Sequence, residues 1–171
     1  TAAEQGVAYF DLTEDVETTD FIKTLDSKNI LMPQCGLAPG AINICAASMM
    51  KEFDSVNEVL MRVGALPRFT TNEMSYYLSW STNGLINEYC NEADAIYEGK
   101  SVKLMPLEGI EKIVIEGESF EAFNTSGGCA TMCETYENQV ENLSYKTIRY
   151  PGHVNHMKFL FNDLHLSLIH I

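Results

Sequence analysis

Basic residues are scarce in this chain of 171 residues, where 11 Lys and Arg stand against 24 Asp and Glu for a formal net charge of −13. Nucleic acids and anionic membrane surfaces are bound by clustered Lys and Arg, so the composition argues against both as partners. The sequence contains no run of apolar residues long enough to span a membrane, and no secretory signal is visible at Thr1. We therefore expect a cytoplasmic protein that binds neither nucleic acid nor membranes.

A disulfide framework is also missing. The five cysteines are an odd number and lie scattered along the chain, which predicts reduced thiols. Cys129 and Cys133 stand four residues apart, a spacing that hints at a metal. No second Cys or His pair lies at ligand spacing, so we expect no metal site.

The Gly-x-Gly-x-x-Gly fingerprint of dinucleotide-binding domains does not occur in the sequence. The chain nevertheless begins with a pattern of strand 6–12, helix 20–28 and strand 30–34, joined by an acidic, Thr-rich stretch 13–20 that is a loop or a helix cap. Strand, helix, strand is the order found in parallel α/β sheets.

The rest of the chain predicts a mixed α/β layer without internal repeats. The expected elements are a helix 41–53 that is apolar on all sides and hence buried, a strand 56–66, a helix 81–97 capped by Ser81 or Thr82, strands 102–105, 111–116 and 120–123, a short helix 125–136, one bent or two short strands 140–150, and a helix 154–164.

The segment Cys35-Gly36-Leu37-Ala38-Pro39-Gly40 joins the second strand to the helix that starts near Ala41. Glycine lets a backbone approach a ligand closely, proline stiffens a turn, and the free N–H groups of a helix start point outward. Ligands of open α/β sheets gather at the carboxyl ends of strands. The segment therefore predicts either a ligand site or a plain strand-to-helix turn.

Arg149 is the first candidate for substrate binding because it ends a strand and is followed by a rigid turn, Tyr150-Pro151-Gly152. A guanidinium can hold a carboxylate by two parallel hydrogen bonds, which a lysine cannot copy. The alternative is a structural ion pair with one of the many acidic residues.

Trp80 is the second candidate, since an indole flanked by the hydroxyls of Ser79 and Ser81 can form one wall of an apolar pocket with small polar donors beside it. The alternative is a core tryptophan next to a helix cap. Tyr76, four residues earlier, could donate its hydroxyl to a ligand or could be an interface aromatic.

His153 follows Gly152 and could transfer a proton near neutral pH, so it is the candidate catalytic residue. The alternative is a histidine that caps a helix or bonds a backbone carbonyl. His153 and His156 share a helix face, but a histidine pair without a carboxylate does not make a metal site.

Four segments together resemble the saccharopine dehydrogenase family, which includes saccharopine reductases and lysine 6-dehydrogenases. They occur in the family's order and cover roughly residues 6–163; they are Cys35 to Gly40, Arg62-Val63-Gly64-Ala65-Leu66-Pro67, Ser79-Trp80-Ser81, and Thr147-Ile148-Arg149-Tyr150-Pro151-Gly152-His153. Many saccharopine reductases carry Asp where this chain has Ala38, a departure that favours the lysine 6-dehydrogenase-like branch and leaves the substrate open.

The resemblance implies the tail of a Rossmann-like dinucleotide-binding domain at residues 1–35, followed by an α+β mixed-sheet substrate-binding and dimerisation domain at 36–166. Residues 167–171 continue no pattern and are expected to be a non-native tail. The chain would then be a fragment of the longer enzyme, inactive alone, and the mixed sheet would pair two copies across a twofold axis.

The implied activity is that of an NAD- or NADP-dependent oxidoreductase acting on a C–N bond of lysine or a lysine conjugate. In that interpretation Cys35, Gly36, Leu37, Pro39 and Gly40 contact the cofactor, with Cys35 packed beside it rather than acting as a nucleophile. Arg149, Trp80, Tyr76 and Ser81 would bind the amino-acid substrate. The alternative hypothesis is a non-catalytic module of the same fold that pairs subunits or binds an amino acid.

Overall fold

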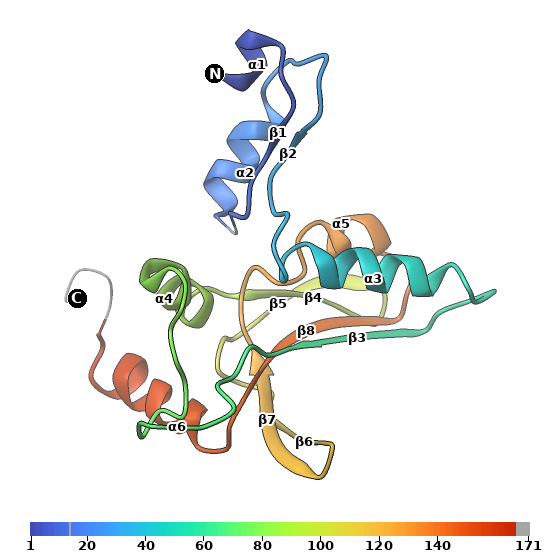
Figure 1. Ribbon diagram of the computed structural model, residues 1–171. Coiled ribbons are helices and arrows are strands. Elements are labelled where there is room, and N and C mark those ends of the chain that lie inside the picture. The colour runs from blue at the N-terminus through green and yellow to red at the C-terminus, as the bar shows by residue number, and fades with distance from the viewer. Residues whose placement is uncertain (14, 167–171) are drawn as a thin grey trace.

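The computed structural model describes residues 1–13 and 15–166, so the tail predicted at 167–171 lies outside the described residues. The N-terminal segment of the chain, up to the end of the second strand at Met32, forms a small N-terminal lobe that projects from the rest of the molecule (Figure 1). Its two strands pair in parallel. The elements of the lobe are α1 (Ala2–Gln5), β1 (Tyr9–Phe10), α2 (Val16–Lys23) and β2 (Leu31–Met32).

The predicted order of strand, helix and strand in the lobe is confirmed, although both strands are shorter than expected. Helix α2 starts earlier than predicted because the Asp15 carboxylate accepts a hydrogen bond from the Thr18 amide at 2.7 Å and caps the helix. One of the two interpretations of the stretch 13–20 was a helix cap, and Asp15 provides that cap for α2. That this lobe is the tail of a Rossmann-like domain stays a prediction.

The body of the molecule is built on a mixed six-stranded sheet, as the sequence predicted. Its elements are α3 (Ala41–Met50), β3 (Glu58–Val63), α4 (Thr82–Cys90), β4 (Ala93–Tyr97), β5 (Lys100–Leu104), β6 (Glu111–Ile115), β7 (Glu118–Asn124), α5 (Met132–Tyr136), β8 (Asn142–Arg149), α6 (His153–Lys158) and the π-helical turn η1 (Phe159–Asp163).

Strand β8 holds the sheet together because it pairs with three other strands, β3, β4 and β7. One edge pairs with β3 in parallel, in a register that runs from Glu58 opposite Asn142 to Val63 opposite Thr147. The other edge pairs antiparallel with β4 near its start and with β7 near its end, where Arg149 lies opposite Glu121. The carboxyl ends of β3 and β8 therefore lie together.

Two hydrophobic cores hold the helices in place. Helices α3 and α5 cover one face of the sheet (Figure 1) over a core formed chiefly by β3, β8 and the segment before α5. Helices α4 and α6 lie at one end of the sheet (Figure 1) and pack with strand β7 and the 66–78 segment around Tyr89 and Phe123. The candidate residues of the 76–89 region and of the end of β8 meet beside this second core.

Two sequence predictions about helices are wrong. Helix α3 is not buried on all sides, since Ile44 and Met49 are 71% and 65% exposed and only Asn43 is buried. A helix that is apolar all round gives no periodic signal to show which face packs. The helix expected over 81–97 ends at Cys90, because residues 93–97 pair with β5 and join the sheet as β4.

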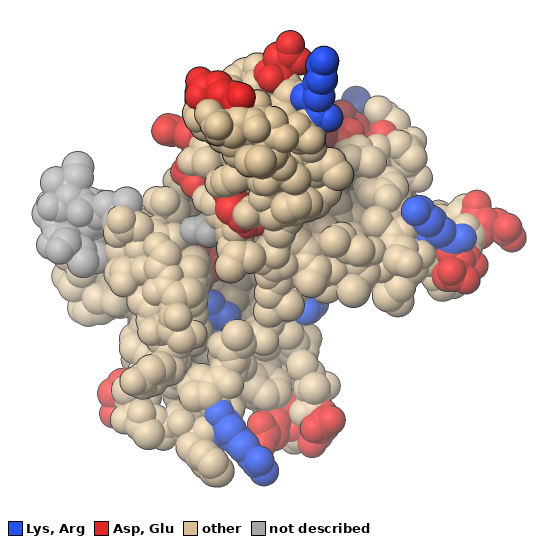
Figure 2. Space-filling model, turned by 45° about the horizontal axis from the view of Figure 1, so that its top comes forward, with Lys and Arg blue, Asp and Glu red and all other residues tan. Residues whose placement is uncertain are grey.

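The sheet face opposite α3 carries a polar cluster in which Glu111 pairs with both Arg62 and Lys146. Figure 2 shows acidic side chains over the N-terminal lobe and at the projecting tips of the molecule, with Lys and Arg atoms scattered between them. The expected pairing of two copies through this sheet stays a prediction. Within the described ranges, no helix is long and apolar enough to cross a bilayer.

Candidate functional site

The Cys35–Gly40 turn is a tight loop whose ends meet. Gly36 and Gly40 form an isolated β-bridge, the Ala38–Pro39 bond is cis, and Gly40 has φ of 135°. A Cβ atom at Gly40 would lie 2.2 Å from the Gly36 carbonyl oxygen, a distance at which two heavy atoms collide. Only glycine can therefore occupy this position without opening the turn.

Asn43 fixes this turn to the body of the molecule. Its Oδ1 accepts a hydrogen bond from the Gly40 amide at 2.7 Å. Its Nδ2 donates to the carbonyl oxygens of Gly128 and Cys129 at 3.0 and 3.2 Å. One buried amide side chain thus links the turn, the start of α3 and the loop before α5.

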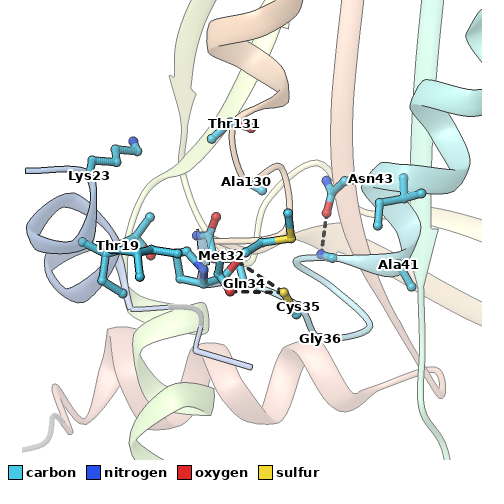
Figure 3. Close-up of a pocket in the computed structure, with 15 residues that line it drawn as sticks. Thr19, Lys23, Met32, Gln34, Cys35, Gly36, Ala41, Asn43, Ala130 and Thr131 are labelled. Carbon is cyan, nitrogen blue, oxygen red and sulfur yellow. Dashed lines mark hydrogen bonds between the residues drawn. The ribbon is translucent and has the colours of Figure 1, made fainter. Parts of the chain in front are cut away.

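A cavity of about 470 Å³, which we call the Cys35 cavity, lies between the N-terminal lobe and the start of α3. Figure 3 shows Cys35, Met32 and Thr19 on one side of it and Asn43 and Ala41 on the other. The Cys35 thiol donates to the Met32 carbonyl at 3.3 Å. Of the residues predicted to contact a cofactor, Cys35, Gly36 and Gly40 line this cavity.

A second cavity of about 290 Å³, which we call the Arg149 cavity, lies on the other side of the same turn. Gly36 lines both cavities. The Arg149 cavity brings together residues that are far apart in the sequence, and its wall consists of Leu12, Gly36, Leu37, Ala38, Pro39, Val63, Gly64, Ala65, Tyr76, Trp80, Glu88, Ser126, Tyr145, Thr147 and Arg149. The turn, the tryptophan segment and the end of β8 therefore meet, although the roles predicted for them stay predictions.

Arg149 is buried, with 4% of its surface exposed, and it has no carboxylate partner among the salt bridges of the described residues. Its Nε donates to the Tyr89 hydroxyl at 2.9 Å and its Nη1 to the Ile148 carbonyl at 2.9 Å. The guanidinium carbon lies 4.3 Å from the centre of the Tyr76 ring. The alternative interpretation of Arg149 was a structural ion pair with an acidic residue, and these contacts do not include one.

Tyr76 and Trp80 form one wall of the Arg149 cavity. The Trp80 indole donates its Nε1 hydrogen to the Tyr76 hydroxyl at 2.8 Å. Trp80 is 41% exposed and is therefore not a core residue, whereas Tyr76 is buried. Ser81 is absent from the cavity wall, and its Oγ accepts from the Gly84 amide at 3.0 Å, which confirms that it caps α4.

His153 lies behind the cavity rather than in its wall. It is 1% exposed, and its Nδ1 lies 2.9 Å from the Met74 carbonyl oxygen. Burial lowers the pKa of His153 to about 4. The bond to a backbone carbonyl, which was the alternative interpretation of this residue, is present. The histidine ring also packs edge-on against the wall residue Tyr76, with ring centres 5.4 Å apart, and its Nε2 lies 3.1 Å from the Tyr89 hydroxyl.

Sequence reasoning missed two polar residues of the cavity wall, Glu88 and Thr147. Thr125 lies 2.7 Å from Thr147, and Thr147 donates to a Glu88 carboxylate oxygen at 2.6 Å. Two signals were available. Tyr145, Thr147 and Arg149 alternate along β8 and so share one face of the strand. Glu88 interrupts the apolar inner face of α4 between Leu85 and Tyr89.

Two comparisons with known proteins agree with the fold. Residues 36–167, more than half of the chain, match the saccharopine dehydrogenase C-terminal domain. The chain belongs to this family. A solved structure, the apo form of histidine-tagged saccharopine dehydrogenase (L-Glu forming) from Saccharomyces cerevisiae, matches 94% of the chain with a TM-score of 0.67 and 19% sequence identity.

At that identity the match to the yeast protein shows the fold alone. The present chain spans 39% of the length of the yeast chain. The family implies a nicotinamide cofactor, and the contact predicted for it at the Cys35–Gly40 turn stays a prediction. Gly36 and Leu37 present backbone to the Arg149 cavity, and a Cβ at Gly36 would come within 3.1 Å of the Pro39 carbonyl oxygen. In the part of the chain that the structure describes, no group of three or more His, Cys, Asp and Glu side chains could hold a metal ion.

Proposed function

We propose that this chain supplies the amino-acid-binding part of a nicotinamide-dependent oxidoreductase that acts on the CH–NH or CH–NH2 group of lysine or a lysine conjugate. The Arg149 cavity is the substrate site in this proposal. The family membership of the chain supports the class of enzyme, and the chemistry of the cavity wall supports an amino acid as the substrate.

The observation that carries the proposal is the burial of Arg149 without a salt bridge among those of the described residues. Removing a cation from water is costly unless an anion or a full set of hydrogen bonds compensates for the loss. A guanidinium has five N–H donors, and the contacts of Arg149 with described residues use two of them. Three donors therefore remain for a ligand, and a carboxylate of the substrate is the anion that matches their planar geometry.

The rest of the wall suits the other end of a lysine-like molecule. Glu88 places a carboxylate in the same cavity, where it accepts a hydrogen bond from Thr147. An ammonium group of the substrate is its natural complement. Trp80 and Tyr76 provide an aromatic wall for the aliphatic stem between the two charged ends.

A nicotinamide, when bound beside the Cys35–Gly40 turn, would supply or accept a hydride at the carbon that bears the nitrogen. This chain's own contribution is to hold that carbon in position and to exclude water from it. Arg149 fixes the carboxylate, the aromatic wall fixes the stem, and Gly36 to Pro39 form the side of the cavity where the ring would lie.

The test is nicotinamide reduction by the full-length gene product with lysine, and nicotinamide turnover with saccharopine. Arg149→Lys keeps the charge but loses the planar fork, so we expect kcat/KM for the amino acid to fall by about 10- to 100-fold. Arg68→Lys is the matched control, since Arg68 is exposed and stacks only on Phe69. Turnover that Arg149→Lys leaves intact would contradict the carboxylate clamp. Binding of amino acid without any turnover would favour the non-catalytic module instead.

A further inference from the structure

Behind the Arg149 cavity, a series of hydrogen-bonded polar groups ends at the Arg149 guanidinium and includes two buried residues that the proposed function does not use, Tyr89 and His153. It runs from the Met74 carbonyl through His153 and Tyr89 to Arg149, with successive distances of 2.9, 3.1 and 2.9 Å. Tyr89 and His153 are each 1% exposed. Buried polar groups of this kind are expensive unless each hydrogen bond is made, so the direction of each bond can be worked out.

The Met74 carbonyl can only accept a hydrogen bond, so Nδ1 of His153 carries a hydrogen. Burial lowers the pKa of His153 to about 4, which leaves the ring neutral near pH 7 and gives Nε2 a free lone pair. The Tyr89 hydroxyl must then donate to Nε2. Its oxygen is left as the acceptor for the Nε hydrogen of Arg149, and burial also raises the pKa of Tyr89, so the phenol keeps its proton.

Each of these four hydrogen-bonded residues comes from a different part of the fold. Met74 belongs to the segment that carries Tyr76 and Trp80, Tyr89 to α4, His153 to α6 and Arg149 to the end of β8. The Glu121 carboxylate fixes the start of α6 by accepting from the Gly152 and Val154 amides at 3.1 and 2.8 Å. The position of the guanidinium is thus coupled to the position of the aromatic wall.

We propose that Tyr89 and His153 are positioning residues that orient the Arg149 guanidinium, so that its remaining donors point at a substrate carboxylate in the cavity. The proposal rests on the function proposed above. Neither residue touches the substrate. Their effect is to hold Nε, which together with the Nη1 bond to the Ile148 carbonyl fixes the plane of the guanidinium.

The first experiment is Tyr89→Phe in the full-length gene product, with kinetics measured separately for the amino acid and for the nucleotide. The change removes one oxygen and keeps the ring, so Arg149 loses its Nε acceptor. We expect KM for the amino acid to rise about tenfold, with kcat changed far less and KM for the nucleotide unchanged. Tyr136→Phe is the matched control, because Tyr136 lies outside the cavity wall and its hydroxyl makes no hydrogen bond with the described residues.

A second pair of variants separates positioning from packing. His153→Gln retains a donor and an acceptor, whereas His153→Leu has neither. A positioning role predicts that His153→Gln has the lower KM for the amino acid of the two. Equal KM values in these two variants, or a Tyr89→Phe enzyme with the wild-type KM, would overturn the proposal.

Nitrogen-15 NMR of the unmodified 171-residue chain tests the same geometry without any activity. We expect His153 to carry its hydrogen on Nδ1 at pH 7 and the Nε hydrogen of Arg149 to exchange slowly. A hydrogen on Nε2 would overturn the proposed direction of the bonds. A wild-type protein that gives these NMR signals but turns over no amino acid would refute the proposed function. The hydrogen bonds from Met74 to Arg149 would still be as proposed.

Discussion

Replacing Asn43 by alanine should destabilise the protein far more than an ordinary surface substitution. The change removes three hydrogen bonds to backbone groups and leaves the Gly40 amide and the Gly128 and Cys129 carbonyls without their partner. A donor or acceptor left unsatisfied in a buried place costs about 1–3 kcal/mol, and carbonyls that lose one of two possible bonds cost less. We therefore expect a loss of about 3 kcal/mol in the free energy of unfolding.

The assay is urea unfolding followed by circular dichroism, with Asn155→Ala as the control. Asn155 occupies the third position of α6, as Asn43 does in α3, but it is exposed and its side chain makes no hydrogen bond with the described residues. The control should change stability by less than about 0.5 kcal/mol. Equal stability of the two variants would refute the claim that Asn43 pins the turn to the body.

Two further perturbations test the Cys35–Gly40 turn and the buried His153. Gly40→Ala should open the Cys35–Gly40 turn, because a Cβ there meets the Gly36 carbonyl at 2.2 Å, and strained φ values alone cost roughly 1–3 kcal/mol; thermal unfolding should show the loss, and an unchanged Tm would contradict the geometry. Stability should also fall as pH drops from 6.5 toward 4, since an unfolded His153 takes up a proton in this window and the folded one, with its pKa lowered to about 4, does not. The loss should be larger in the wild type than in His153→Gln by an amount on the order of 3 kcal/mol, as measured by urea unfolding at both ends of the window.

Local patterns were enough to predict much of the fold. The strand periodicity around Val59 and Met61 and the cap at Ser81 depend on neighbours in the sequence, and the structure confirms both. The helix expected to reach Tyr97 was wrong because residues 93–97 are set by pairing with β5, a contact that no local pattern records. The exposure of α3 was missed because a helix that is apolar on every side hides the direction of its packing.

The candidate site divides in the same way. Arg149, Trp80 and the glycine turn could be chosen because each has an unusual residue type at a chain turn. Glu88 and Tyr89 could not be chosen as site residues from the sequence. They reach the site because the fold brings α4 against the end of β8. The Arg149–Tyr89 hydrogen bond joins residues 60 positions apart, and only the tertiary structure brings them together.

The most direct test of the account compares lysine with lysinamide as substrates of the full-length gene product. The amide lacks the carboxylate that Arg149 is proposed to hold but keeps the stem and the ammonium groups. We predict that kcat/KM for lysine exceeds that for lysinamide by at least about tenfold in the wild type, and that Arg149→Lys removes most of this preference. A preference of the same size in Arg149→Lys would contradict the central claim that this arginine recognises the substrate carboxylate.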